Sequence, residues 1–219
     1  QQIVMSITLI IIIITVLVSI AAFSNDKIYN DLIFYPPAVT HNNQWYRFVT
    51  CGFIHADWGH LIFNMYAFYM FGEYVENAFI SLFAEKGKVL YLLMYITALA
   101  VCLLPTYAKH KEDSSYRSLG ASGAVSAVIF AYILLDPLNK IGIIFLPPQL
   151  GLPGFVFGLL YLIISSWLDR RGGGNINHSA HIWGAFYGIS FLILAGYIFS
   201  DYQVLEAFLQ KVQTWIGGL

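Results

Sequence analysis

Charged side chains are scarce in this 219-residue chain. Asp, Glu, Lys and Arg together make up 11% of the residues, whereas soluble domains carry roughly 25%. The net charge is −1, so there is no basic surplus to attract nucleic acid. Hydrophobic residues reach 58% of the chain. This is more than a soluble domain of this length needs for its core, and it indicates a protein whose solvent is lipid.

Cysteine is scarce as well. Cys51 and Cys102 stand in apolar surroundings, and we interpret them as small buried hydrophobes, with a disulfide as the less favoured alternative. The motif H-E-x-x-H is missing, and so is any cysteine cluster. The histidines, including His55 and His178, therefore do not predict a zinc site. We expect no metal and no other cofactor.

Long apolar runs are abundant. Because every backbone polar group must be paired within lipid, these runs predict helices. Six of them are predicted to span a membrane: 3–23, 60–79, 89–104, 122–135, 153–168 and 179–199. The first lacks a basic flank and a small-residue cleavage site, so we interpret it as a span and not as a signal peptide. The chain begins at Gln1, and further residues are expected before it.

The predicted spans define one membrane domain over residues 1–201, followed by a tail over 202–219. In the tail, apolar residues recur at helical spacing with polar residues between them. This pattern predicts an amphipathic helix that lies at the membrane interface or docks on the bundle. Between spans, turn signals mark a long polar connection over 24–59, a charged loop over 109–113 and a glycine loop at 172–174.

Two polar residues at membrane depth suggest chemistry. Ser122 follows Gly120-Ala121 at the start of one apolar run, and His181 stands inside another. Polar groups inside a membrane are costly and tend to be kept for function. A serine with a distant histidine is the pairing that a nucleophile and its base require. The bland alternative is a serine that bonds its own helix backbone.

Small residues predict that the helices carrying this pair pack closely. Ridges of small residues four apart let membrane helices approach backbone to backbone. One ridge consists of Gly123, Ala127 and Ala131, and the other of Ala180, Gly184 and Gly188. Close contact between the ridges would bring the serine hydroxyl within reach of the imidazole. The helix start at Ser122 also offers unpaired N–H groups to an oxyanion.

His60 and Asn64 are four residues apart and therefore share a helix face. Both can donate hydrogen bonds, and two donors aimed at one point suit a developing oxyanion. The alternative is a structural hydrogen-bond pair between helices. Considered alone, the pair favours the structural interpretation. Its coincidence with Ser122 and His181 favours the oxyanion site.

Taken together, these residues resemble the rhomboid family of intramembrane serine proteases. The resemblance runs in order from residue 45 to 188. Its pieces are Trp45-Tyr46-Arg47, His55, His60 to Asn64, Gly72 with Glu76, Gly120 to Gly123, and Ala180 to Gly184 with Gly188. Each piece is loose, but their combination is specific.

The resemblance implies an all-helical, six-span bundle with a water-filled cavity. It implies a Ser122–His181 dyad without an acid, and an oxyanion hole formed by His60, Asn64 and the Ser122 backbone. It implies cleavage of single-pass or other transmembrane proteins near a bilayer face, with lipid as the surroundings. The location expected is a bacterial inner membrane. Structural support is expected from Arg47, Glu76, Gly120, Gly123, Gly184 and Gly188.

Two positions leave alternatives open. Rhomboids often carry an aromatic residue one turn after the nucleophile, stacked on the histidine, but this chain has Ser126 there. Its hydroxyl is predicted to reach the His181 ring, or else to bond the Ser122 carbonyl or simply pack. Arg47 and Glu76 would form an ion pair, or each would reach the lipid headgroups.

Two functions from different classes remain. The first is a membrane-embedded serine protease. The second is a non-catalytic rhomboid-like protein that binds or escorts membrane clients. Because both the serine and the histidine are present, the sequence favours the enzyme. A transporter is a distant third hypothesis, since inverted repeats and paired broken helices are not apparent.

Overall fold

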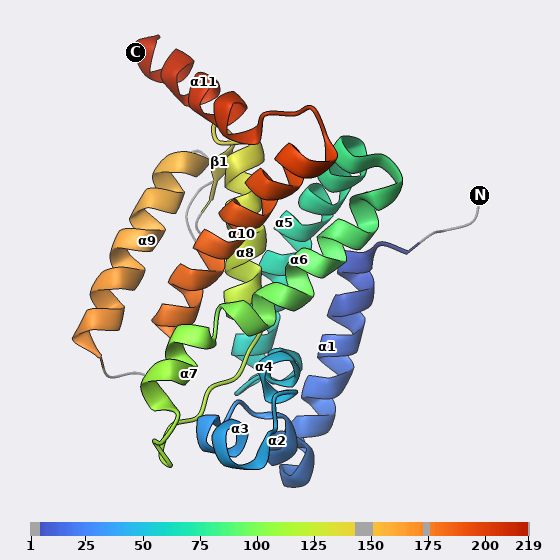
Figure 1. Cartoon of the computed structure of the whole chain (residues 1–219), viewed down its shortest axis with the longest axis vertical. Coiled ribbons are helices and arrows are strands. Elements are labelled where there is room, and N and C mark those ends of the chain that lie inside the picture. The colour runs from blue at the N-terminus through green and yellow to red at the C-terminus, as the bar shows by residue number, and fades with distance from the viewer. Residues whose placement is uncertain (1–4, 143–150, 173–175, 219) are drawn as a thin grey trace.

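The computed structural model describes residues 5–142, 151–172 and 176–218, and most of them are helical, as predicted. Six longer helices coincide with the six predicted runs, and a seventh lies in the tail (Figure 1). These are α1 (Ile7–Phe23), α5 (Trp58–Phe83), α6 (Gly87–Val101), α8 (Ser122–Leu135), α9 (Gly154–Arg171), α10 (His178–Phe199) and α11 (Val204–Gly217).

Helix α8 occupies the centre of the bundle. Every residue from Gly123 to Leu135 is buried, so the helix has no lipid-facing side. It packs most extensively on α10 and also meets α5, α6 and α9. Figure 1 shows α9 at one edge of the bundle and α1 at the opposite edge. The site predicted at Ser122 therefore begins the most enclosed helix of the protein.

The six predicted spans differ in length. By length and apolarity, two helical stretches could cross a membrane alone: Trp58–His110, which holds α5 and α6, and His178–Phe199. Helices α1 and α8 are apolar but have only 17 and 14 residues. A helix of 14 residues is about 21 Å long, which is shorter than a hydrocarbon core of about 30 Å. The helical character is confirmed, and the number of spans stays a prediction.

The connection over residues 24–59 is more ordered than predicted. It contains α2 (Asp26–Leu32), α3 (Pro36–Asn42), α4 (Arg47–Thr50) and the short 3-10 helix η1 (Cys51–Phe53). These helices gather at one end of the bundle (Figure 1). Pro36-Pro37 starts a helix here, because proline is well suited to a first turn, where its missing N–H has no partner to lose.

Four further elements lie between the long helices. The 3-10 helix η2 (Ala84–Lys86) joins α5 to α6, and α7 (Leu104–His110) continues beyond Pro105, again with proline in the first turn. Strands β1 (Lys140–Ile141) and β2 (Leu152–Pro153) pair antiparallel, so the fold is not purely helical. Part of the predicted glycine loop, residues 173 and 174, lies outside the described residues.

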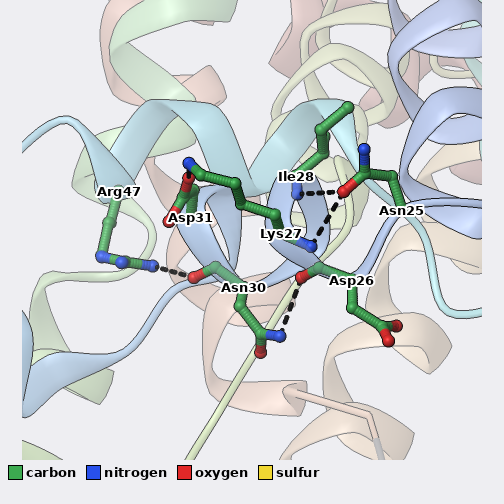
Figure 2. Close-up of polar contacts among 7 residues, drawn as sticks. All are labelled: Asn25, Asp26, Lys27, Ile28, Asn30, Asp31 and Arg47. Carbon is green, nitrogen blue, oxygen red and sulfur yellow. Dashed lines mark hydrogen bonds and ion pairs between the residues drawn. The ribbon is translucent and has the colours of Figure 1, made fainter.

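The predicted Arg47–Glu76 pair is wrong, because each residue is buried and bonds elsewhere. The Arg47 guanidinium donates to the backbone carbonyls of Asn30 (2.8 Å) and Ile33 (2.7 Å) and to the Gln44 side chain (2.6 Å). Figure 2 shows Arg47 reaching the carbonyl of Asn30 beside the first turns of α2. Arg47 therefore links separate parts of the connection 24–59 to one another and does not reach lipid headgroups.

Glu76 ties α5 to the start of α1. Its carboxylate accepts from the backbone N–H groups of Ile7 and Thr8 and from the Thr8 hydroxyl, each at 2.9 Å. The first N–H groups of a helix lack partners within the helix and carry the positive end of its dipole. The Glu76 carboxylate accepts from these N–H groups, and its negative charge is attracted by the positive end of the dipole. These interactions explain why Glu76 is tolerated while buried.

The tail helix α11 lies at the end of the bundle opposite α2 and α3 (Figure 1). Lys211 donates from its ammonium group to the Leu135 carbonyl at 2.7 Å and so caps the last turn of α8. Trp215 meets Phe155 edge to face, with ring centroids 5.5 Å apart. The amphipathic tail is thus docked on the bundle at its polar and aromatic contacts, while Leu205 and Leu209 stay exposed.

Candidate active site

Ser122 is the first residue of α8. Gly120 precedes it with φ +104°, a backbone conformation that favours glycine and turns the chain into the helix. The cap residue is Ala121, and no side chain of the described residues caps this helix start. The first N–H groups of α8 are therefore left for another acceptor, at the positive end of the helix dipole.

His181 lies in the first turn of α10 and faces Ser122. Its Nε2 is 2.8 Å from the Ser122 Oγ, within hydrogen-bond distance. The start of α10 is fixed by Asn177, whose side-chain oxygen accepts from the Ala180 N–H at 3.0 Å. The same side chain also contacts Thr106. The predicted pair, Ser122 and His181, is thus brought together from two helices although the two residues are 59 positions apart in the chain.

Glycines set the distance between these two helices. A Cβ atom added at Gly184 would lie 2.0 Å from the Gly123 carbonyl oxygen, and one at Gly188 would lie 2.1 Å from that of Ala127. No side chain fits into such gaps. The two predicted ridges therefore pack backbone to backbone, as small-residue ridges do. This contact begins directly beside Ser122 and brings the hydroxyl and the imidazole together.

His60 stands at the start of α5 and leans on Gly120. A Cβ atom at Gly120 would meet the His60 ring at 2.6 Å, so glycine is needed for this approach as well as for its φ angle. The His60 Nδ1 accepts from the Ala56 N–H at 3.4 Å. Since a neutral imidazole carries one proton, this bond assigns the proton to Nε2. His60 can therefore donate from the nitrogen that lies against Gly120.

Asn64 follows one turn later on α5. One N–H of its amide donates to the His60 carbonyl at 3.1 Å. The amide group has two N–H bonds, so the second is left for another acceptor. His60 and Asn64 thus share a helix face as predicted, and they are joined through the His60 backbone rather than through their side chains.

His55 packs against the ring of His60. It is fully buried, and its Nδ1 lies 3.0 Å from the Ser19 hydroxyl. Its ring meets the His60 ring edge to face, with centroids 4.9 Å apart. Burial, together with the neighbouring His60, lowers the pKa of His55 to about 3. His55 is therefore neutral at physiological pH and adds no charge beside the site.

The hypothesis that Ser126 bonds the His181 ring is wrong. Its hydroxyl donates instead to the Ser122 carbonyl at 2.9 Å, the alternative bond considered from the sequence. The Ser126 Oγ also lies 2.6 Å from the hydroxyl of Tyr161 on α9. The Tyr161 ring is stacked with the His181 ring, with centroids 6.2 Å apart and planes inclined by 27°. The aromatic partner of the histidine therefore comes from another helix.

These side chains line a common cavity of about 530 Å³. The cavity is walled mainly by apolar side chains, and polar residues converge on it from four helices, α5, α8, α9 and α10. They include His60, Asn64, Ser122, Ser126, Tyr161 and His181. An apolar pocket with a few convergent polar groups is the usual form of an active site. This one places a hydroxyl, an imidazole and several N–H donors around one space.

Comparison with known proteins agrees with the geometry. The family description "Rhomboid domain" matches residues 42–198, which is most of the chain. The chain belongs to the rhomboid family. The match begins just before Arg47 and ends in α10, so it includes the whole Ser122–His181 cavity.

Named relatives of this rhomboid occur in bacteria and in plants. Rhomboid protease GlpG of Haemophilus influenzae is 28% identical over 84% of this chain and 87% of its own length. Putative rhomboid protease YdcA of Bacillus subtilis is 27% identical over 69% of this chain and 68% of its own. RHOMBOID-like protein 12, mitochondrial, of Arabidopsis thaliana is 30% identical over 66% of this chain, a match that covers 44% of that protein.

The remaining histidine near the rhomboid site is His178. Its ring meets the His181 ring edge to face, with centroids 5.7 Å apart. Its Nδ1 is buried and has no hydrogen-bond partner among the described residues. In the described ranges, no three side chains of His, Cys, Asp or Glu gather as metal ligands would. His178 thus packs beside the His181 ring.

Sequence reasoning missed Tyr161 in this rhomboid. It interpreted the apolar run of α9 as a span and did not single out Tyr161. The available signal was the small residue at Ser126, which leaves room for a ring beside His181. Nothing in the spacing of α9 identifies which of its aromatic residues occupies that room.

Proposed function

We propose that this rhomboid is an intramembrane serine protease that hydrolyses peptide bonds in or near the transmembrane segments of membrane proteins. One observation carries the proposal: the Ser122 Oγ lies 2.8 Å from the His181 Nε2 at the wall of a mainly apolar cavity. A nucleophile within hydrogen-bond reach of its base is the arrangement that acyl transfer requires.

In the proposed reaction, His181 Nε2 takes the proton of the Ser122 hydroxyl while Oγ attacks the substrate carbonyl carbon. The carbonyl oxygen gains negative charge. His181 then passes the proton to the leaving amine as the C–N bond breaks. A water molecule, deprotonated by His181, releases the acyl group and restores the Ser122 hydroxyl. Each step moves one proton through the same imidazole.

The oxyanion would be stabilised by His60, Asn64 and the Ser122 N–H. His60 Nε2 carries its proton, the Asn64 amide has a free N–H, and the start of α8 is uncapped. Donors that are already oriented toward the developing charge stabilise it without the reorganisation that solvent water would need. The dyad needs no acid to operate in this scheme, because Asn177 and Tyr161 hold the elements that position His181.

The membrane setting of the proposal rests on the exposed surfaces of the outer helices. Large apolar side chains are exposed on α1, α5, α9 and α10. Surfaces of this kind suit lipid and transmembrane substrates. We propose a multi-pass domain over residues 1–201 with six spans, a tail over 202–219 at the interface, and a bacterial inner membrane as its location. Relatives in two bacteria support that location.

A fluorophosphonate probe tests the proposal directly, because it modifies only an activated serine. Protein purified in mild detergent should be labelled at Ser122, and His181→Ala should remove the labelling. The matched control is Ser190→Ala, which removes a serine from the exposed side of α10 and should label like the wild type. Failure of the wild type to label, or equal labelling of Ser122→Ala, would contradict the protease and favour a non-catalytic client-binding rhomboid.

The oxyanion site can be tested separately. His60→Ala and Asn64→Ala should each lower kcat by roughly tenfold to a thousandfold, as lost oxyanion donors do, while KM changes little. Cleavage of a fluorogenic transmembrane peptide in liposomes measures both constants. Asn77→Ala is the matched control, since Asn77 makes the same amide bond to the carbonyl four residues earlier on α5, at 2.9 Å, but outside the cavity. Equal effects in Asn64→Ala and Asn77→Ala would restore the structural interpretation.

A further inference from the structure

Helix α9 contributes an aromatic ring to the dyad. The Tyr161 ring is stacked with the imidazole of His181, and it also contacts Phe130 on α8, with ring centroids 5.6 Å apart. His178 meets the same imidazole edge to face. The ring stacked with His181 thus comes from α9, a helix that carries neither Ser122 nor His181.

A directed pair of hydrogen bonds holds this ring in place. The Ser126 hydroxyl has one proton, which it donates to the Ser122 carbonyl at 2.9 Å. Its oxygen must then accept the proton of the Tyr161 hydroxyl, at 2.6 Å. The tyrosine is in this way connected to the residue that supplies the nucleophile. A residue larger than serine at 126 would occupy this space.

The hydrogen bond between Ser126 and Tyr161 joins α8 to α9. Among the described residues, it is the only side-chain hydrogen bond between these two helices. The buried residues of α9 are all small: Gly154, Gly158 and Ser165. The helix stands at the edge of the bundle in Figure 1. The position of the Tyr161 ring therefore depends on α9 lying against α8.

We propose that Tyr161 is a positioning residue for His181, held by Ser126, so that α9 must be docked for the dyad to be ordered. This inference rests on the proposed protease function and deepens it. The ring restricts the tilt of the imidazole and so keeps Nε2 aligned with the Ser122 hydroxyl. Catalysis is sensitive to such alignment, since displacements near 1 Å can cost about a hundredfold in rate.

The test compares tyrosine variants with a matched pair elsewhere in the bundle. Tyr161→Ala should lower kcat by about tenfold to a hundredfold, with KM nearly unchanged, and should slow fluorophosphonate labelling of Ser122 in parallel. Tyr161→Phe keeps the ring and should lose only a few-fold. The control is Tyr187, whose hydroxyl makes an equally short 2.6 Å bond to Thr97 on α6, away from the cavity. Tyr187→Ala and Tyr187→Phe should alter stability but not kcat.

Three further variants separate positioning from packing. The double variant Ser126→Ala/Tyr161→Phe should be no slower than Ser126→Ala, because Ser126→Ala already removes the bond to the Tyr161 hydroxyl. Ser126→Phe in a Tyr161→Ala background returns a ring from α8 and should regain most of the lost kcat. A purely structural tyrosine would show neither the non-additivity nor the rescue.

The outcomes of these experiments test the positioning role of Tyr161 separately from the protease function. A wild-type protein that neither cleaves nor labels would overturn the protease proposal and this inference with it. A labelled and active wild type whose Tyr161→Ala variant keeps its kcat would overturn the positioning role alone. The same holds if Tyr161→Ala and Tyr187→Ala lose kcat equally.

Discussion

Replacing either Ser122 or His181 with alanine should reduce cleavage by roughly 10⁴-fold or more, because the two act as one unit and neither works alone. The double variant should be no slower than the single ones. The measurement is cleavage of a fluorogenic transmembrane peptide by protein in liposomes. Folding should survive, since both side chains line a cavity and their removal leaves the contact between α8 and α10 intact.

The matched control for this loss is Ser190→Ala, which removes a hydroxyl from α10 on its exposed side and should cleave like the wild type. Thermal unfolding in detergent shows whether each variant still folds. Cleavage by purified Ser122→Ala at more than a few per cent of the wild-type rate would refute the dyad.

Gly184→Val should destabilise the protein by about 3 kcal/mol or more, at the upper end of the range for overpacked cores. The first added carbon would lie 2.0 Å from the Gly123 carbonyl oxygen, a backbone atom that cannot turn aside. The helices α8 and α10 must then separate, and the distance from Ser122 to His181 grows with them. Activity should therefore fall even at temperatures where the variant remains folded.

Thermal unfolding in detergent and peptide cleavage measure the two effects of Gly184→Val. Gly217→Val is the control, because Gly217 ends α11 and a Cβ atom there meets nothing within 4 Å. It makes the same Gly→Val change in a helix, but without the clash. A Gly184→Val protein as stable as Gly217→Val would show that the ridge contact does not hold the bundle together.

The sequence predicted the central helix well because its ends are chemically marked. Gly120 supplies the positive φ before Ser122, and a run of apolar residues continues to Leu135 before Asp136 interrupts it. The ridges of small residues also predicted which helices meet most closely, since only glycine permits that distance. These features depend on local chemistry, which a sequence displays directly.

The rest depended on partners that the sequence does not mark. Arg47 donates to backbone carbonyls of the connection 24–59, and no sequence pattern predicts how that connection folds. An ion pair with Glu76 was the simpler hypothesis, and it is wrong. Helix α9 is apolar on most of its circumference, so its periodicity does not tell which face meets the bundle. Whether Tyr161 contacts His181 depends on which face of α9 meets the bundle, so the sequence could not predict this contact.

The complete enclosure of α8 has a consequence for how this protein can vary between species. A helix in contact with lipid can exchange one large apolar residue for another, because lipid chains adapt to any shape. All residues of α8 from Gly123 to Leu135 instead face other protein atoms, and close-packed interiors respond to the gain or loss of a single methylene. Substitutions in α8 should therefore be accepted only together with changes in its neighbours, whereas exposed positions such as Leu159 and Ile163 of α9 are free to drift.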